Sequence, residues 1–197
     1  GPGSGKSYVV RQTTGGLGMK IVNSDNAFEK FLKDANLSLK MPDEEKYARD
    51  PVRAKAKNIT QKQKSNYVEG RLGLIIDGTG KNYAKISDEA TRLKQLGYDV
   101  HMIFVNTSLD TALERNKRRS RSVPESLVIK SWKDVQSNIG KFSQYFRQNF
   151  VVVDNNDTDE DVMTPVYKQI KSLALAKISN PLGKQWVANE LSKKKRK

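Results

Sequence analysis

The chain begins Gly1-Pro2-Gly3-Ser4-Gly5-Lys6-Ser7, a stretch that has the form of a phosphate-binding loop. In such a loop the glycines let backbone N–H groups surround a phosphate, the lysine reaches the β and γ oxygens, and a hydroxyl at the helix start holds Mg²⁺. The sequence therefore predicts a nucleotide site, with Ser7 also as a metal ligand. The residues expected to form it are Gly3, Ser4, Gly5, Lys6 and Ser7.

The loop departs from the full pattern in one respect. That pattern has another glycine before Gly5, at a position that would precede residue 1, and the strand that normally leads into the loop is also absent. Either that strand precedes Gly1 in the protein, or residues 1–4 are a purification scar and the Gly-Lys-Ser run follows by accident. We favour the first alternative because the downstream pattern independently predicts the loop. In this fold that strand is central, so we expect a gap in the sheet.

Strand-like and helix-like segments alternate along the rest of the chain. Apolar, β-rich stretches that end in Asn, Asp or Ser occupy residues 20–24, 71–77, 99–106 and 149–154. Helical patterns occupy residues 26–36, 87–96, 108–118 (starting at Ser108), a segment opened by Pro124, and 159–177. Ser87 suits an N-cap and Gly97 a C-cap. The alternation predicts an α/β fold with a doubly wound parallel sheet and helices on both faces.

Two acidic residues follow strands at positions suited to chemistry. Asp25 closes the run Val22-Asn23-Ser24-Asp25, and ligands bind at the carboxyl ends of strands in doubly wound sheets. Asp25 would therefore lie beside the loop and accept a proton from an attacking hydroxyl, unless it serves as the N-cap of helix 26–36, or does both. The run Leu74-Ile75-Ile76-Asp77 has the form of a Walker B strand, whose acid holds the Mg²⁺ shell. We expect Asp25 as the catalytic base and Asp77 as a metal ligand.

Arginines crowd residues 112–125, which read ALERNKRRSRSVPE. A row of arginines between one helix and a Pro-started helix can close over a triphosphate, because the planar guanidinium binds phosphate oxygens in pairs. We therefore expect residues 115–124 to form a lid, with Arg115, Arg119 and Arg121 on the nucleotide. The alternative is a nucleic-acid patch or a solvated loop.

Several other polar and aromatic residues carry weaker signals. Asn155 follows the last strand and could hydrogen-bond the nucleotide base, but a plain turn is an equal alternative. His101 lies within a strand pattern and is expected to be packed rather than catalytic. Trp132, Tyr145 and Phe146 lie on helical patterns and are expected in the core.

Composition excludes whole classes of site. The 197 residues include no cysteine and one histidine, which excludes disulfide frameworks, Cys nucleophiles, thiolate metal sites and multi-histidine metal sites. No apolar run approaches the roughly 20 residues that span a bilayer. We therefore expect a cytoplasmic protein with no membrane partner.

The formal net charge is +14, and three clusters carry it: residues 46–64, 115–121 and the terminal run KKKRK at 193–197. The lid cluster is expected to meet the phosphates of the nucleotide itself. Only the first and last clusters therefore argue for a second anionic partner, which would be DNA or RNA, although the tail can equally be a solvated face. An ordered tail would indicate an acidic partner or a subunit contact. The expected division of the chain is a P-loop kinase-like domain at 1–179, a basic helical insertion at 38–67 within it, and a basic appendage at 180–197.

Taken in order, the motifs GPGSGKS, VNSD, LIIDGT, ALERNKRRSRSVPE and VVVDN resemble those of the P-loop kinases related to polynucleotide 5′-kinase and zeta toxins. The resemblance leaves out the 38–67 insertion and the tail. It implies ATP and Mg²⁺ as cofactors, bound by Lys6 and Ser7. It also implies Asp25 as general base, Asp77 as the Walker B-like acid and Arg119 as the lid arginine on the transferred phosphate.

One departure from that family concerns the acceptor. Polynucleotide kinases have a further arginine just after the base acid, whereas Asn26-Ala27-Phe28-Glu29 follows here. A standard polynucleotide end is therefore in question as the substrate, and the basic insertion is the alternative source of those contacts.

Two functions remain open at this point. The first is an ATP- and Mg²⁺-dependent kinase that transfers the γ-phosphoryl group to a hydroxyl of a nucleic acid end, a nucleotide or a small sugar-like acceptor. The second is a nucleic-acid-binding or assembly module on a P-loop ATPase fold, with ATP as a switch or the activity lost. The sequence leaves the oligomeric state open.

Overall fold

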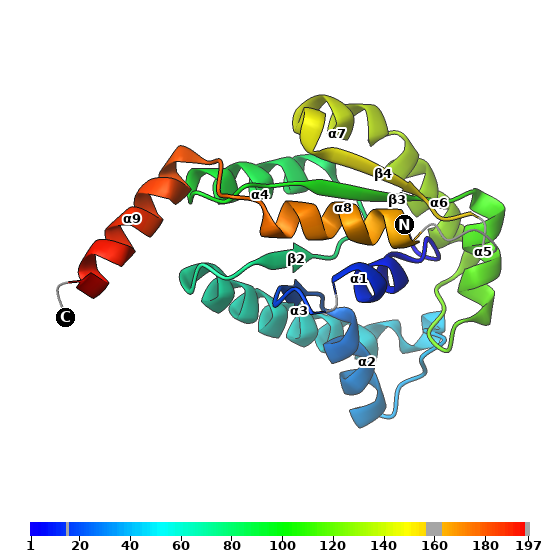
Figure 1. Ribbon diagram of the computed structural model, residues 1–197. Coiled ribbons are helices and arrows are strands. Elements are labelled where there is room, and N and C mark those ends of the chain that lie inside the picture. Colours follow the sequence, from blue (N-terminus) through cyan, green and yellow to red (C-terminus); the bar gives the residue numbers. More distant parts are fainter. Residues whose placement is uncertain (15, 157–162, 196–197) are drawn as a thin grey trace.

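The computed structural model describes residues 1–14, 16–156 and 163–195, in which helices and strands alternate (Figure 1). In chain order the elements are α1 (Lys6–Thr14), β1 (Lys20–Val22), α2 (Asp25–Asp34), α3 (Lys46–Glu69), β2 (Leu74–Ile76), α4 (Tyr83–Gln95), β3 (Met102–Asn106), α5 (Leu109–Arg118), α6 (Glu125–Gln136), α7 (Ile139–Phe146), β4 (Phe150–Asp154), α8 (Met163–Leu175) and α9 (Pro181–Lys195). Short 3-10 helices lie at Asp43–Glu45 and Arg147–Asn149. The elements overlap the predicted segments, although the strands are shorter and the appendage contains a helix. Residues 159–162 of the helix predicted at 159–177 lie outside the described residues.

The strands pair in parallel, but in two separate pairs. β1 pairs with β2, which places Ile21 opposite Ile75, and β3 pairs with β4, which places Phe104 opposite Val152. Among the described residues no strand lies between β2 and β3 to hydrogen-bond with both, so a single doubly wound sheet is not confirmed. The α/β fold with parallel strands and helical connections is confirmed.

Side chains alternate between the two faces of the β3–β4 pair, and helices cover both faces. Phe104 points into a cluster formed with α4, α6 and α7, whose other buried members are Ala90, Val135, Phe142 and Phe146. Val153 points the other way, into a cluster with α1 and α8 whose other buried members are Val9, Val166 and Ile170. This packing holds α1, and with it the loop that precedes α1, against the strands.

The aromatic residues expected in the core differ in how deeply they are buried. Phe146 is buried, and Tyr145 packs against the same cluster. Trp132 is only partly buried, and its Nε1 donates a hydrogen bond to the carbonyl of Thr107 at 2.9 Å. Trp132 therefore ties α6 to the end of β3 rather than filling the core.

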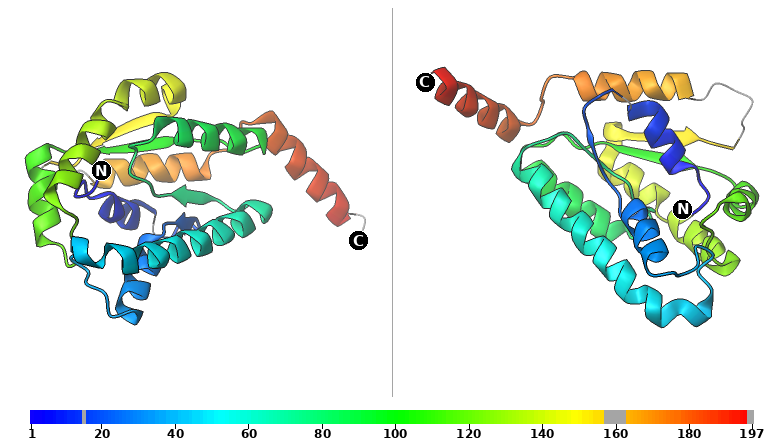
Figure 2. Two further views of the ribbon diagram at one scale, coloured as in Figure 1. Left: turned by 180° about the vertical axis from the view of Figure 1, so that it is seen from behind. Right: turned by 90° about the horizontal axis from the view of Figure 1, so that it is seen from below.

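The insertion at 38–67 has a more apolar face than its basic composition suggested. Its helix α3 runs along one side of the molecule beside α2 (Figure 2). Met41 and Ala56 of the insertion form a buried cluster with Phe28 and Leu32 of α2. Because these side chains are removed from water, α3 is a packed part of the fold and not a loosely attached arm.

The start of α4 differs from the prediction. Ser87 does not cap this helix, because the helix begins at Tyr83 and the side chain of Asn82 accepts the capping hydrogen bond from the N–H of Lys85 at 3.0 Å. Ser87 instead lies buried inside α4. By contrast, Ser108 caps α5 as predicted, accepting a hydrogen bond from the N–H of Thr111.

Helix α9 extends away from the rest of the molecule (Figures 1 and 2), and contacts at its start and at Trp186, whose ring lies 5.5 Å from the guanidinium of Arg71, hold it. Gly97 has a φ of 95°, as expected of a glycine that ends a helix, and a Cβ on Gly183 would lie 2.3 Å from the Gly97 carbonyl oxygen. Asp99 accepts hydrogen bonds from the N–H and hydroxyl of Ser179, at 2.7 and 2.5 Å. None of the helices described is long and apolar enough to cross a bilayer.

Candidate active site

The loop before α1 has no space for side chains at two of its glycines. Gly3 and Gly5 have φ values of 78° and 80°, in the left-handed region that favours glycine. A Cβ at Gly3 would lie 2.1 Å from the carbonyl oxygen of Ala112, and a Cβ at Gly5 would lie 2.2 Å from Nδ2 of Asn155. The loop is therefore packed directly against α5 and the end of β4. It leads into the N-terminus of α1, and the first backbone N–H groups of a helix generally lack partners within the helix and can bind an anion.

Asn155 braces this loop from the end of β4. The side chain is buried, and its Nδ2 donates a hydrogen bond to the carbonyl of Ser4 at 2.9 Å. Arg115 on α5 donates from Nη1 to the carbonyl of Asn155 at 2.6 Å, which links the lid helix to the same point. The amide nitrogen of Asn155 thus holds the loop instead of reaching toward a base, and Arg115 holds the backbone at the foot of the lid.

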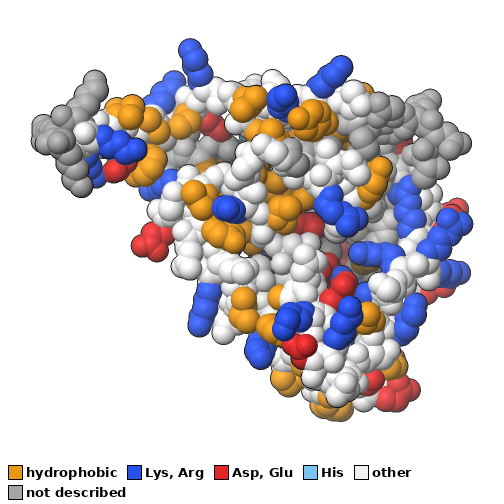
Figure 3. Space-filling model, turned by 60° about the horizontal axis from the view of Figure 1, so that its bottom comes forward, with side chains coloured by type: hydrophobic (Ala, Val, Ile, Leu, Met, Phe, Trp, Pro, Cys, Tyr) orange, Lys and Arg blue, Asp and Glu red, His pale blue; other side chains and the backbone are white. Residues whose placement is uncertain are grey.

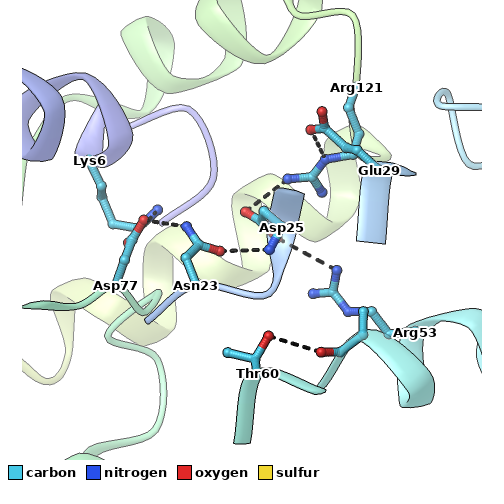
Figure 4. Close-up of polar contacts among 9 residues, drawn as sticks. Lys6, Asn23, Asp25, Glu29, Arg53, Thr60, Asp77 and Arg121 are labelled. Carbon is cyan, nitrogen blue, oxygen red and sulfur yellow. Dashed lines mark hydrogen bonds and ion pairs between the residues drawn. The ribbon is translucent and has the colours of Figure 1, made fainter. Parts of the chain in front are cut away.

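A chain of polar contacts runs from Lys6 to Asp25 (Figure 4). Lys6 Nζ lies 3.7 Å from Oδ1 of Asp77, whose side chain is only 4% exposed. Asn23 donates from Nδ2 to Oδ2 of Asp77 at 2.6 Å, and Oδ1 of Asn23 accepts from the N–H of Asp25 at 2.7 Å. The ends of β1 and β2 and the start of α1 thus bring together the lysine, the Walker B-like acid and the expected base.

The other side of Asp25 carries two arginines (Figure 4). Nη2 of Arg121, from the lid, lies 2.9 Å from Oδ2 of Asp25, and its Nε donates to Oε1 of Glu29 at 2.8 Å. Nη1 of Arg53, from α3, lies 3.7 Å from Oδ1 of Asp25. Arg121 was expected on the nucleotide phosphates, but here its charge is matched by carboxylates of α2.

The alternative role of Asp25 as a helix cap finds no support in the contacts. Asp25 is the first residue of α2 and Ser24 occupies the cap position, with no side-chain capping hydrogen bond. The Asp25 carboxylate makes ion pairs with arginines rather than bonds to the first N–H groups of α2. Its chemistry is therefore directed away from its own helix.

The lid is closed at its base by a buried asparagine. Asn116 donates from Nδ2 to the carbonyl of Val123 at 2.9 Å and accepts from the N–H of Val123 at 3.1 Å, so its side chain acts like a paired strand residue. Arg119 ends α5 with an exposed side chain for which the described residues provide no acid within ion-pair distance. Of the predicted lid arginines, Arg119 is the cation left available.

The residues present fit a nucleotide with Mg²⁺. Asp77 is buried beside Lys6, and Ser7 lies in the first turn of α1. The described residues contain no group of three or more acidic or histidine side chains that could enclose a metal. Mg²⁺ in nucleotide sites needs only one or two protein oxygens, because water and phosphates supply the others. Ser7 and Asp77 would therefore be sufficient protein ligands.

Four residues of this arrangement were missed by sequence reasoning: Asn23, Glu29, Arg53 and Asn116. Asn23 had a signal, since it ends a strand next to Asp25. Asn116 belongs to the arginine-rich motif but was overlooked beside its charged neighbours. The roles of Arg53 and Glu29 depend on the packing of α3 and the lid on α2, which the sequence pattern did not specify.

The basic clusters are less free than their charge suggests. In the 46–64 cluster, Arg53 pairs with Asp25, Lys64 pairs with Glu89, and the ammonium of Lys55 lies over the ring of Phe31. Figure 3 shows acidic side chains among the basic ones on the face that carries α2, α3 and the lid. Of the tail run, residues 193–195 belong to α9, and residues 196–197 lie outside the described residues.

A family model described as an AAA domain matches residues 1–141, which is more than two-thirds of the chain. No curated protein matches the chain significantly. The chain therefore belongs to the AAA domain family and contains a nucleotide-binding P-loop domain.

Proposed function

We propose that this P-loop protein is an ATP- and Mg²⁺-dependent kinase that transfers the γ-phosphoryl group to a hydroxyl. The observation that carries the proposal is the contact chain from Lys6 through Asp77 and Asn23 to Asp25. Transfer to a hydroxyl requires a group on the acceptor side that can take the hydroxyl proton, and a carboxylate can do so. Here the backbone N–H of Asp25 bonds to Asn23, one residue beyond Asp77, and the Asp25 carboxylate pairs with two arginines.

Each residue along this series of contacts has a role that follows from its position. Lys6 and the N–H groups of the loop hold the β and γ phosphates, and Ser7 and Asp77 hold the metal shell. Bound Mg²⁺ neutralises charge on the phosphate oxygens. Asn23 fixes both Asp77 and the backbone of Asp25, so it sets the spacing between the nucleotide side and the acceptor side. Asp25 accepts the proton of the acceptor hydroxyl as its oxygen bonds to the γ-phosphorus and ADP leaves with the bridging oxygen.

The three lid arginines have different roles. Arg119 is exposed and free of a described acidic partner, so it is suited to stabilise charge on the transferred phosphoryl group. Arg115 holds the carbonyls at the foot of the lid, where it stays close to Gly5. Arg121 anchors the lid on α2 through Glu29 and Asp25.

The proposal is tested with γ-labelled ATP and a panel of hydroxyl compounds that includes nucleic acid 5′ ends, nucleosides and sugars. The wild-type chain should label at least one acceptor, and Lys6→Ala should reduce transfer by about 100-fold or more because a phosphate-binding charge is lost. Arg11→Ala is the matched control, since Arg11 is an exposed basic residue on the same helix. Release of phosphate to water alone, with no labelled acceptor, contradicts the kinase proposal.

A nucleic-acid-binding module on a P-loop fold is the second candidate. It is favoured by the exposed side chains of Lys46, Lys57 and Lys62 on α3, which have no ion-pair partner among the described residues. This candidate predicts salt-sensitive binding of DNA or RNA that Lys6→Ala leaves unchanged, with no transfer to any hydroxyl. The kinase proposal predicts transfer that depends on Lys6.

A further inference from the structure

Asp25 has contacts on two sides (Figure 4). On one side its carboxylate pairs with two arginines. On the other side its backbone N–H bonds to Asn23, and Asp77 and Lys6 lie beyond. If the kinase function proposed above holds, ATP fills that side, and the acceptor hydroxyl must reach Asp25 from the side of Arg53 and Arg121. The chemistry of these two arginines therefore selects the acceptor.

The two arginines differ in their exposure and in how closely they contact the carboxylates of α2. Arg121 is 9% exposed and makes two short contacts, at 2.9 Å to Asp25 and 2.8 Å to Glu29. Arg53 is 38% exposed, and its nearest nitrogen is 3.7 Å from Asp25, beyond hydrogen-bond distance. Arg53 therefore keeps donors available for a ligand, whereas Arg121 is used by the fold.

Packing fixes the position of Arg53. Its guanidinium lies over the ring of Phe28, with 4.4 Å from the guanidinium carbon to the ring centroid, and Phe28 is buried. Ala56, one turn further along α3, is fully buried against α2 and keeps the helix in place. Burial lowers the pKa of Arg53 from its usual value; Asp25 partly offsets the shift and Arg121 adds to it. An additional anion next to this partly desolvated cation would be stabilising.

The proton transfer itself creates a need for such an anion. Asp25 carries the negative charge that faces Arg53 before the reaction. When Asp25 accepts the hydroxyl proton, that charge is lost and Arg53 is left beside a neutral carboxyl group. An anionic group on the acceptor would replace it at the moment when it disappears.

We infer that Arg53 is an acceptor-binding residue and that the acceptor is a hydroxyl compound that carries a phosphate group close to the reacting hydroxyl. The planar guanidinium can bind two phosphate oxygens at once while Asp25 takes the hydroxyl proton. The inserted helix α3 thus supplies a cation that the α2 segment after Asp25 does not contain.

The test compares acceptors in matched pairs, each hydroxyl compound with and without a phosphate: ribose and ribose 5-phosphate, and adenosine and adenosine 3′-phosphate. We expect kcat/KM to favour the phosphorylated member by about 10- to 100-fold, as for a hydrogen bond between charged groups. Arg53→Gln should abolish this preference without changing the KM for ATP. Arg53→Lys should retain part of it. Arg92→Gln is the matched control, because Arg92 is an exposed arginine on α4.

A second measurement does not depend on turnover. Inorganic phosphate is titrated calorimetrically into the protein saturated with a non-hydrolysable ATP analogue. The wild-type chain and Arg92→Gln should bind phosphate about 10- to 100-fold more tightly than Arg53→Gln does. Circular dichroism should show that all three proteins are equally folded.

The possible failures are distinguishable. Transfer that depends on Lys6 but proceeds equally well to both members of each pair overturns this inference and leaves the kinase function in place. Equal phosphate binding by the wild-type chain and Arg53→Gln overturns it as well, whatever the turnover. Absence of any transfer, with the phosphate titration unaffected by Arg53, contradicts both proposals.

Discussion

A Cβ added at Gly5 is enough to displace Asn155, whose side chain holds the phosphate loop. The 2.2 Å that would separate this carbon from Nδ2 of Asn155 is far below a van der Waals contact, and the positive φ adds strain. Gly5→Ala should therefore lose nucleotide affinity by about 10-fold or more, since strain of about 1–3 kcal/mol falls on the loop itself. The measurement is calorimetric titration with ATP.

Gly140→Ala is the control for that substitution. Gly140 lies in α7 with nothing within 4 Å of the added carbon, so the change should leave ATP affinity unaltered and stabilise the helix by about 0.5–1 kcal/mol. Equal ATP affinity for the two variants would show that the loop does not hold the nucleotide.

His101 gives the protein a pH dependence near neutrality. Burial lowers the pKa of His101 below its usual value of 6.5, and Asp99 partly offsets the shift. The unfolded chain is therefore protonated first, so stability falls as pH drops through 6.5 toward the lower pKa of the folded state. His101→Gln should flatten the dependence of Tm on pH between about pH 7.5 and 5.

His101 is the only histidine, so no other side chain has its usual pKa in that window. The α-amino group of Gly1 also titrates there, because burial lowers its pKa from 8.0 to about 5, and it contributes equally to the wild-type chain and to the variant. Burial raises the pKa of Asp99, but hydrogen bonds from Ser179 and Asn180 outweigh this and leave it below 3.8. The stability that ionised Asp99 contributes to the folded protein is therefore lost only at more acidic pH. A variant whose Tm curve runs parallel to that of the wild-type chain would disprove the role of His101.

The local geometry around the candidate site was predictable where backbone chemistry restricts the choice. Gly3 and Gly5 of the predicted loop have positive φ values, and Lys6, which follows them, lies 3.7 Å from Asp77. The partners of Asp25 were not predictable, because Arg53 lies on a different helix and reaches it only through the packing of Phe28 and Ala56. Side chains brought together by tertiary contacts leave no short-range signal in one sequence.

At the scale of the elements, the lid depends on one asparagine as well as on its arginines. Asn116→Ala removes both hydrogen bonds to Val123, at about 1 kcal/mol each, and leaves the loop between α5 and α6 free to open. Trypsin should then cut the exposed lysines and arginines of the lid several-fold faster than in the wild-type chain. Ser120→Ala, in the exposed part of the same loop, should leave the cleavage rate unchanged.

The outcome that contradicts this account of the lid is equal cleavage of Asn116→Ala and Ser120→Ala. Saturating ATP provides an internal check, because it should slow cleavage in the wild-type chain by drawing Arg119 onto the phosphates.

Element boundaries were predictable where a cap was unambiguous. The Ser108 side chain caps the start of α5, and Gly97 follows the end of α4 with the positive φ that suits a glycine there. Ser87 was misassigned because Asn82, an equally good cap, stands earlier in the chain, and Ser87 can bond within the helix to the carbonyl of Ala84. The strand segments were correct in place, but how they combine into sheets is a tertiary property that local patterns do not carry.

At the scale of the whole molecule, the charge of +14 is not one binding surface. Arg53, Lys64 and Arg121 are matched by carboxylates, so part of the positive charge serves the fold. The ends of β1 and β2, α1, α3 and the lid converge on the line from Lys6 to Asp25 (Figure 4). Under the proposed kinase function, the molecule has a nucleotide side and an acceptor side that meet at Asp25.

The central claim is that Asp25 is the base of a phosphoryl transfer, and it is tested most directly by single-turnover transfer from γ-labelled ATP with Asp25→Asn. Asp34→Asn is the matched control, because Asp34 is an exposed carboxylate at the other end of α2. The account predicts that Asp25→Asn lowers the transfer rate by about 10²- to 10⁴-fold with ATP affinity retained, whereas Asp34→Asn transfers like the wild-type chain. Equal rates for Asp25→Asn and Asp34→Asn would contradict it.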